Sequence, residues 1–247
     1  MADPIFENQR LVAIYDALDG ERTDLDAYLA VVDELSARSV LDIGCGTGTF
    51  ACLLARRGIR VIGVDPASAS LDIARAKSGG DLVQWIRGDA AGLPPVSVDL
   101  VTMTGNVAQV FLTDDDWAAT LRGAHAALVP NGRLVFETRN PDRRAWLDWT
   151  SERSHACINV PGVGEVESWV DVIDLRGELV SFRWTFVFGS DGAVLTSDST
   201  LRFRHPDEVV DSLSATGFEL EDVRDAADRP GRELVFVARP RAPLSAD

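Results

Sequence analysis

The chain of 247 residues is long enough for one large hydrophobic core, and its 46% apolar and 26% charged content is ordinary for a globular protein. Its formal net charge of −15 repels phosphate groups and anionic lipids, so neither nucleic acid nor a membrane is expected as a partner. The sequence has no apolar run of 18 residues, no pattern of a secretory leader and no metal-ligand or disulfide spacing among its three cysteines. We therefore expect a cytoplasmic protein that binds no metal.

Two amphipathic helices are predicted before the first strand, because apolar residues recur at helical spacing from Leu11 to Leu18 and from Leu25 to Leu35. A buried strand over residues 40–43 then leads into a glycine-rich turn and a helix. The elements predicted after it are strand 60–65, helix 67–77, strand 82–86, strand 98–103, a helix from Thr113 that Pro130-Asn131-Gly132 ends, strand 133–138, a helix from Pro206 that Gly217 closes, strand 218–223 and strand 233–238.

The most informative stretch is Val-Leu-Asp-Ile-Gly-Cys-Gly-Thr-Gly at residues 40–48. Its glycines allow the backbone to turn sharply and to approach a ligand that a Cβ atom would keep away. Such a turn at the start of a helix forms a cradle for a nucleoside-containing cofactor. A dinucleotide fingerprint would need its third glycine at Thr49, whereas this chain has Gly-x-Gly-x-Gly preceded by an acid, Asp42.

Taken as a whole, this stretch resembles motif I of the class I S-adenosylmethionine (SAM)-dependent methyltransferases, in which the turn holds the methionyl part of SAM. The chain is similar to the small-molecule group that includes the glycine and amino-sugar N-methyltransferases, and the resemblance covers residues 38–140 and 205–240. It implies an α/β, Rossmann-like doubly wound sheet of seven strands in the order 3-2-1-4-5-7-6, with the last strand antiparallel. It also implies SAM as the cofactor and S-adenosylhomocysteine (SAH) as its product.

Two acids that follow strands are candidates for binding the nucleoside. Asp65 lies 21 residues past Gly44, the spacing at which a strand-end carboxylate meets ribose hydroxyls, and it has no evident partner in the unliganded chain. The resemblance implies that Asp89 accepts from the adenine amino group and that the Ala90 amide meets a ring nitrogen. Either acid alone fits a turn or helix cap equally well, whereas the two together after motif I favour a cofactor site.

The predicted N-terminal helices cover the cofactor in related methyltransferases, where an aromatic residue and an arginine hold the SAM carboxylate. Tyr15 and Arg22 occupy similar places here, and the alternative for Tyr15 is packing in the core. The full set of expected cofactor-binding residues is Tyr15, Arg22, Asp42, Gly44, Cys45, Gly46, Asp65, Pro66, Ser70, Asp89, Ala90, Thr104, Gly105, Asn106 and Gln109.

Methyl transfer from a sulfonium is an in-line displacement that needs no enzyme nucleophile, so the protein acts chiefly by alignment and exclusion of water. The sequence accordingly has no Gly-x-Ser-x-Gly and no paired cysteine and histidine. The catalytic residues are left unknown. His155 is the candidate general base, although a lone histidine is more often a packed or surface residue. The acids that follow Thr113 are interpreted as a helix start and not as a metal site.

We expect one structural unit with three parts: an N-terminal helical cover at 1–37, the SAM-binding core at 38–140 and 205–240, and an antiparallel β insertion at 141–204. The insertion should begin with a short helix at 141–149 and continue with strands near 156–160, 166–174, 179–188 and 194–203. It either covers the substrate or forms a dimer interface, so the chain is expected to be a monomer or a homodimer.

The leading hypothesis is a SAM-dependent methyltransferase that modifies a small molecule, with nitrogen or oxygen favoured over carbon or sulfur as the acceptor atom. A SAM-binding protein without catalysis is an alternative, because binding needs the same residues. An NAD(P)-dependent oxidoreductase on a Rossmann fold is disfavoured by Asp42, by the missing third glycine and by the predicted C-terminal hairpin.

Overall fold

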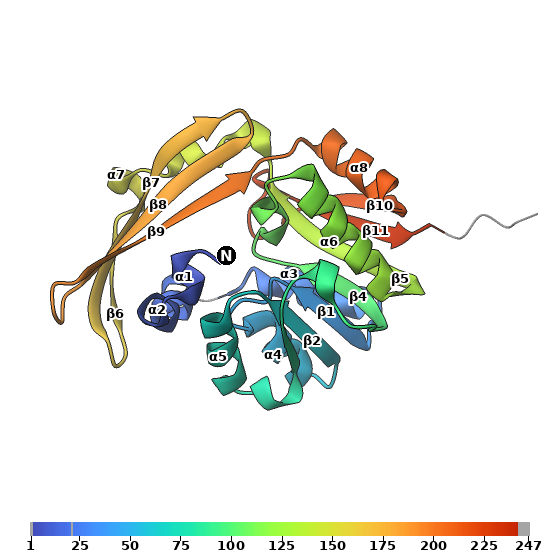
Figure 1. Ribbon diagram of the computed structural model, residues 1–247, viewed down its shortest axis with the longest axis horizontal. Helices are drawn as coiled ribbons and strands as arrows, with labels where there is room; N and C mark the ends of the chain where they lie inside the picture. The colour runs from blue at the N-terminus through green and yellow to red at the C-terminus, as the bar shows by residue number, and fades with distance from the viewer. Residues whose placement is uncertain (1, 21, 242–247) are drawn as a thin grey trace, which may run out of the picture.

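A computed structural model describes residues 2–20 and 22–241 of the chain. Figure 1 shows a mixed sheet with helices on both faces, a second, antiparallel sheet beside it, and the N-terminal helices α1 and α2 between the two. The strands of the first sheet, in spatial order, are β10 (Phe218–Asp225), β11 (Glu233–Pro240), β5 (Leu128–Arg139), β4 (Val98–Met103), β1 (Ser39–Ile43), β2 (Arg60–Asp65) and β3 (Gln84–Arg87).

This order is the predicted one. Strands β3, β2, β1, β4 and β5 pair in parallel, and β11 pairs antiparallel with both β5 and β10. The prediction of a doubly wound, seven-stranded sheet that ends in an antiparallel strand is therefore confirmed. Because five strands are parallel, their carboxyl ends meet at one edge, where open α/β sheets bind ligands.

Alternating residues of the central strands pack into two hydrophobic cores, one on each face of the sheet. In β1, Val40 faces the core that contains α3 and α4, whereas Leu41 faces the core that contains α6 and α8. A strand buried on both faces explains why residues 40–43 are almost uniformly apolar in sequence. The helices of these two layers are α3 (Leu25–Glu34), α4 (Thr49–Arg56), α6 (Asp114–Ala127) and α8 (Pro206–Ala215), and α5 (Ser68–Ala76) follows β2.

The short helical turns are placed at the connections: η1 (Gly80–Leu82), η2 (Ala90–Gly92), η3 (Val107–Val110), η4 (Pro141–Arg143) and η5 (Ala145–Asp148). The sequence predicts one helix at 141–149, and the structure has η4 and η5 instead. Arg144 separates them with φ of 46°, in the left-handed region that an α-helix cannot contain.

Strand β5 begins earlier than the sequence predicts. Helix α6 ends at Ala127 and β5 starts at once at Leu128, so that Pro130, Asn131 and Gly132 lie inside the strand and do not end the helix. The pairing with β4 shifts between Val98 and Leu100, because β5 has extra residues there. A bulge of this kind accommodates proline and glycine without interrupting the sheet.

The insertion is an antiparallel sheet, as predicted, and its strands are β6 (Ala156–Val160), β7 (Gly164–Arg176), β8 (Leu179–Phe188) and β9 (Val194–Arg202), preceded by α7 (Ser151–Ser154). Its inner face buries Phe186 and Phe188 against Leu11 and Ile14 of the N-terminal helices. These helices are α1 (Pro4–Glu7) and α2 (Gln9–Asp19). The N-terminal segment thus shares a core with the insertion.

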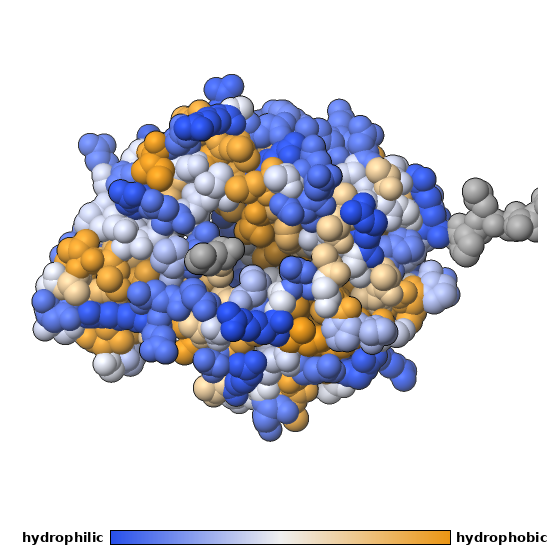
Figure 2. Space-filling model, in the orientation of Figure 1, coloured by the Kyte–Doolittle hydropathy of each residue, from blue (hydrophilic) through white to orange (hydrophobic). Residues whose placement is uncertain are grey.

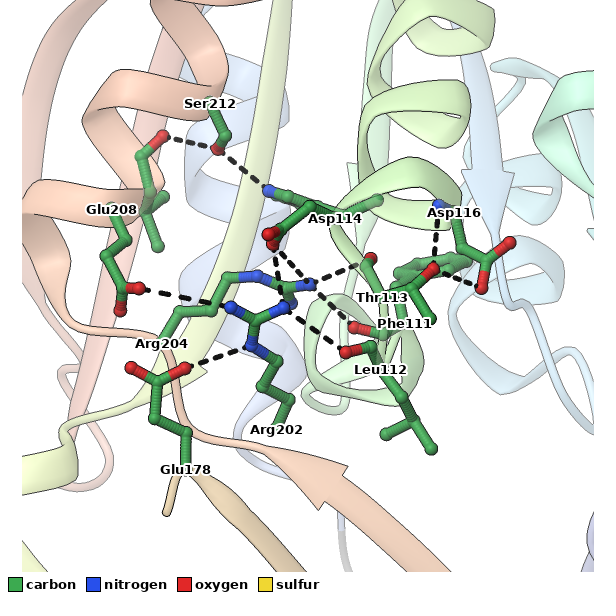
Figure 3. A network of polar contacts seen from close by, with 12 residues as sticks. Phe111, Leu112, Thr113, Asp114, Asp116, Glu178, Arg202, Arg204, Glu208 and Ser212 are labelled. Atoms are coloured by element: carbon green, nitrogen blue, oxygen red, sulfur yellow. Dashed lines mark hydrogen bonds and ion pairs between the residues drawn. The ribbon is translucent and has the colours of Figure 1, made fainter.

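Two arginines at the end of β9, Arg202 and Arg204, connect the insertion to the start of α6 and the loop before it (Figure 3). Arg202 pairs with Asp114 at 2.7 Å and with Glu178 at 3.0 Å. Arg204, which is buried, donates to the Phe111 carbonyl at 2.8 Å. The predicted helix cap at Thr113 is also present, since its hydroxyl accepts the Asp116 amide at 3.1 Å.

No helix in the described part of the chain is both long enough and apolar enough to cross a bilayer.

Candidate functional site

The glycine turn after β1 is fixed by the neighbouring strand. The Gly44 amide donates to the Val64 carbonyl at 2.8 Å, so the turn leaves the sheet beside the end of β2. Gly44 has φ of +69°, and a Cβ on it would lie 2.6 Å from Val107, so a side chain there is excluded by packing. Gly46 has φ of +53°, and a Cβ on it would meet nothing within 4 Å. The turn is therefore closed at Gly44 and open at Gly46.

Asp65 at the end of β2 supports this turn. One carboxylate oxygen accepts the Gly46 amide at 2.9 Å, and the other accepts the Ala67 amide at 2.8 Å. Asp65 therefore does have partners in the unliganded chain, and the expectation that it has none was wrong. Burial raises its pKa, and the two backbone hydrogen bonds oppose that rise. Each carboxylate oxygen can accept a second hydrogen bond, so the group can still receive a diol.

Asp42 lies under the turn and is 1% exposed. Burial raises its pKa to about 7, against a hydrogen bond from the Thr102 hydroxyl at 3.1 Å, and the nearby charge of Asp65 adds to the rise. Two acids thus lie at the ends of adjacent strands below the glycine turn. A cationic ligand at this edge would favour the ionised form of both.

The segments after β2 and β3 lie beside Asp65. Pro66 is exposed, while Ser70 in α5 is fully buried and donates its hydroxyl to the Phe6 carbonyl at 2.8 Å. Asp89 is exposed and accepts the Gly92 amide at 2.9 Å, which makes it the cap of η2. Ala90 is buried. The predicted nucleoside residues therefore follow neighbouring strands, and Asp89 has a capping role in the unliganded chain.

The loop after β4 carries the next four expected residues. Thr104 is half-buried, and Gly105 has φ of +69° with open space where a Cβ would lie. Asn106 is buried, and its side-chain oxygen has no hydrogen-bond partner among the described residues. Gln109 is also buried and accepts from Nη1 of Arg139 at 3.1 Å. An unpartnered buried acceptor next to an open glycine indicates a place for a donor from a ligand.

A buried acidic cluster adjoins this loop and was not predicted. Glu137 of β5 accepts the Asn106 amide at 3.0 Å and the Tyr28 hydroxyl, and burial followed by the charge of Glu233 raises its pKa. Glu233 accepts from Asn106 Nδ2 at 3.0 Å and pairs with Arg229 at 2.8 Å. The one signal in the sequence was an acid within the apolar strand 133–138. Its partners come from distant segments, which no local pattern reveals.

The two candidates for the SAM carboxylate differ in availability. Tyr15 is half-buried and packs against Phe6 with ring centroids 5.5 Å apart; burial raises the pKa of its phenol. Arg22 is held by Asp19 at 2.9 Å and by Asp24 at 2.8 Å, and its pKa is raised because these carboxylates outweigh the effect of burial. Arg22 would have to release one of them to bind another carboxylate.

Helix α2 is joined to the glycine turn and the start of α4 by polar contacts among four side chains. The Thr47 hydroxyl donates to Asp16 at 2.6 Å, and Lys77 pairs with the same carboxylate at 2.6 Å. Lys77 also donates to the Thr49 hydroxyl at 2.7 Å. The N-terminal cover is thus tied to the turn that it was expected to cover.

The remaining candidates are Cys45 and His155. Cys45 lies within the turn, and burial raises the pKa of its thiol, which makes it a poor nucleophile. His155 stacks on Trp169 and lies 3.4 Å from Glu167, both on the outer face of β7, whereas the neighbouring Ser168 on the inner face is buried. The structure therefore does not bring His155 together with the other site residues.

Figure 2 shows a hollow on this face of the molecule, between the insertion and the larger sheet, with apolar surface inside it. The carboxyl ends of β4 and β5, the insertion and the N-terminal helices surround this region (Figure 1). An acceptor molecule that reached the open edge of the sheet would enter between these parts.

Comparisons with known proteins agree with this geometry. Residues 40–132 match the family model described as a methyltransferase domain. This part of the chain is similar to a methyltransferase domain. The match begins at β1 and ends inside β5, so it covers the strands that carry Asp42, Asp65 and the loop after β4.

Two curated relatives have different acceptor atoms in their names. The cypemycin N-terminal methyltransferase of a Streptomyces species is 32% identical over 145 residues, which are 57% of this chain and 59% of that protein. The ubiquinone biosynthesis O-methyltransferase of Idiomarina loihiensis is 36% identical over 120 residues, 47% of this chain and 48% of that protein. The chain therefore spans only about half to three-fifths of these relatives.

The structural similarity extends over nearly the whole chain. The CcbJ methyltransferase of Streptomyces caelestis is 25% identical, has a TM-score of 0.71, and covers 93% of this chain and 96% of its own. Since 93% of this chain is covered, the similarity takes in most of the insertion, whereas the family model stops before it.

Proposed function

We propose that this chain is a SAM-dependent methyltransferase that transfers a methyl group to a nitrogen or oxygen atom of a small molecule. The observation that carries the proposal is the pair of acids, Asp42 and Asp65, below a glycine turn that is open at Gly46, in a methyltransferase domain. The names of the two curated relatives, one an N- and one an O-methyltransferase, support these two acceptor atoms equally.

The residues present fit SAM as the cofactor. Gly46 and Gly105 have positive φ with open space where a Cβ would lie, and the side-chain oxygen of Asn106, the residue after Gly105, is buried without a hydrogen-bond partner among the described residues. We infer that Asp65 receives the ribose hydroxyls with its free lone pairs and that the Ala90 segment meets the adenine. Asp42, when ionised, favours the positive charge of the methionyl part.

SAM, when bound, would supply an electrophilic methyl group on a sulfonium: the acceptor would attack the methyl carbon in line with the carbon–sulfur bond, which breaks as SAH leaves with the electron pair. The chain contributes alignment and exclusion of water. Helix α2 and the inner face of the insertion enclose the carboxyl edge of the sheet, so we infer that the insertion covers the substrate. No general base is assigned, because His155 lies on the outer face.

The alternative, a SAM-binding protein without catalysis, would use the same cofactor-binding residues. The enclosure of the edge by α2 and the insertion supports catalysis, because a sensor does not need to exclude water around an acceptor. An NAD(P)-dependent oxidoreductase loses support, since the last strand in sequence, β11, runs antiparallel to β5.

Thermal unfolding with SAM, SAH and NAD tests the cofactor. A ligand present at 100 times its dissociation constant adds about 2.7 kcal/mol to the free energy of unfolding, which moves the melting temperature measurably. SAM and SAH should stabilise the protein and NAD should not. Release of SAH from an amine or hydroxyl acceptor then separates an enzyme from a sensor. Stabilisation by NAD alone would refute the proposal.

A further inference from the structure

Arg139 is the last residue of β5, and three parts of the fold meet around its side chain. The guanidinium carbon lies 5.5 Å from the ring centre of Trp149, which belongs to the insertion. Its other neighbours are Gln109, in the loop after β4, and Glu233 of β11. One cation therefore lies where the carboxyl edge of the sheet meets the insertion.

The guanidinium has more donors than partners. Within the described residues, the one hydrogen bond that it donates runs from Nη1 to the side-chain oxygen of Gln109, at 3.1 Å. Its Nε lies 3.9 Å from the Glu233 carboxylate, which is beyond hydrogen-bond distance. Yet a guanidinium has five N–H donors, and only 24% of this side chain is exposed. Such a group is suited to a planar anion that accepts two parallel hydrogen bonds.

The neighbouring carboxylates are occupied by other groups. Glu233 pairs with Arg229 at 2.8 Å and accepts from Asn106, while Glu137 accepts from Asn106 and Tyr28. The ion pair of Arg139 with Glu233 is thus a long one, at 3.9 Å, with a carboxylate that Arg229 contacts more closely. Both glutamates would repel a phosphate dianion more strongly than a carboxylate, because the carboxylate carries a single negative charge.

We propose that Arg139 binds a carboxylate of the methyl acceptor, with Trp149 against the apolar part of the same molecule. The proposal rests on the proposed function and names a substrate class: small carboxylic acids or amino acids with an apolar body. Arg139 thereby becomes a specificity-determining residue.

The position of Arg139 separates this role from binding of the SAM carboxylate. Strand β5 is two strands away from β1, so at about 4.8 Å per strand Arg139 lies roughly 10 Å across the sheet from the glycine turn. The methionyl part of SAM is expected at that turn, near Arg22. The edge beyond β4 is left for the acceptor.

The test compares two probes of the same shape. Benzoate carries a carboxylate and benzamide carries a neutral amide, and each is titrated into SAH-saturated protein while tryptophan fluorescence is followed. Benzoate should bind at least tenfold tighter than benzamide, and phenyl phosphate should bind no tighter than benzamide. In Arg139→Met, the preference for benzoate should disappear, and Arg139→Lys, which keeps the charge without the planar fork, should fall between.

The control variant is Arg183→Met, since Arg183 is exposed on the outer face of the insertion, paired with Asp198. It should keep the wild-type preference, and SAH affinity should stay within about twofold in all variants. Equal binding of benzoate and benzamide by the wild type would overturn the proposal without any variant. So would an Arg139→Met protein that keeps the preference, or one that loses SAH more than tenfold. Failure of the wild type to bind SAH would instead contradict the proposed function. The ratio of benzoate affinity to benzamide affinity, measured on the protein without SAH, would still test the role of Arg139.

Discussion

The carboxylate of Asp65 accepts the amide of Gly46 at 2.9 Å, which ties the end of β2 to the glycine turn that follows β1. The residue proposed to receive the ribose therefore also shapes the turn proposed to hold the methionyl part. Binding and folding are linked through one side chain, and a substitution there should affect both.

Asp65→Ala should weaken SAM by about 10- to 100-fold or more, because a hydrogen bond from a ribose hydroxyl to a charged acceptor is worth roughly 1.5–3 kcal/mol. It should also destabilise the unliganded protein by about 2 kcal/mol, a fall of roughly 4–8 °C in melting temperature, since the Gly46 and Ala67 amides lose their acceptor. Asp65→Asn, with one acceptor oxygen left, should fall between in both measurements. Calorimetric titration measures the affinity for SAM, and melting curves measure the stability. An unchanged melting temperature in Asp65→Ala would show that the two backbone contacts do not contribute to stability.

Asp42 should make the unliganded protein less stable as the pH rises. Its pKa is about 7 in the folded chain and near 4 when unfolded, so its stabilising contribution is complete below pH 4 and is lost as the pH rises to 7. The loss is at most about 4 kcal/mol. Asp42→Asn should remove this part of the pH dependence and be more stable than the wild type at pH 8, as chemical denaturation at several pH values can measure.

Asp42→Asn, which should stabilise the unliganded protein at pH 8, should weaken its binding of SAM. An ionised Asp42 favours a cationic ligand, so SAM should bind the wild type more tightly above pH 7 than below it. Asp42→Asn should bind SAM weakly at every pH. A wild-type affinity that does not change between pH 5.5 and 8.5 would contradict this role, whatever the stability of the variant.

The parts of the site that were predictable are those whose signal is local. The glycine turn, the strand-end acids and the cap at Thr113 each depend on a few consecutive residues, and the structure has all of them in the expected elements. The buried contact of Glu137 with Tyr28 was not predictable, because it joins β5 to α3 and depends on the tertiary arrangement.

The same reason explains what was missed in the fold. The strands of the insertion were predicted from alternation, but nothing in residues 1–37 indicated that Leu11 and Ile14 would pack on Phe186. The bulge in β5 was missed as well, since proline and glycine at 130–132 predict a turn unless the pairing with β4 is known. A partner across the fold overrides the local preference.

Lys77→Met should loosen helix α2 from the glycine turn. Lys77 joins Asp16 of α2 to Thr49, and both side chains of the ion pair are partly exposed, so the loss of stability should stay below about 1 kcal/mol. Dissociation of SAM should become several-fold faster, because the cover opens more often. Stopped-flow displacement measures the rate. Glu219→Gln, which breaks an exposed pair with Arg239 elsewhere, is the control, and an equal acceleration in both variants would argue against a covering role for α2.

Two glycines of the turn should respond differently to the same substitution. A Cβ on Gly48 would lie 2.5 Å from Trp85, whose indole is fixed by a hydrogen bond to the Gly80 carbonyl at 2.8 Å. Left-handed strain of roughly 1–2 kcal/mol and overpacking of roughly 1–3 kcal/mol should together lower the melting temperature of Gly48→Ala by about 10 °C. Gly46→Ala carries the strain alone, so its melting temperature should fall by only a few degrees.

For the affinity for SAM the order should be reversed, with the larger loss in Gly46→Ala. The new methyl group of Gly46→Ala projects into open space where the cofactor is proposed to lie, so SAM should bind at least tenfold more weakly. Gly162→Ala, at φ of +79° in the β6–β7 turn with no neighbour within 4 Å, has the strain without the site and should keep wild-type affinity. Melting curves and calorimetric titration of the three variants give the comparison. If Gly46→Ala binds SAM as tightly as Gly162→Ala does, the cofactor does not lie against the open side of the turn, because a methyl group there would displace it.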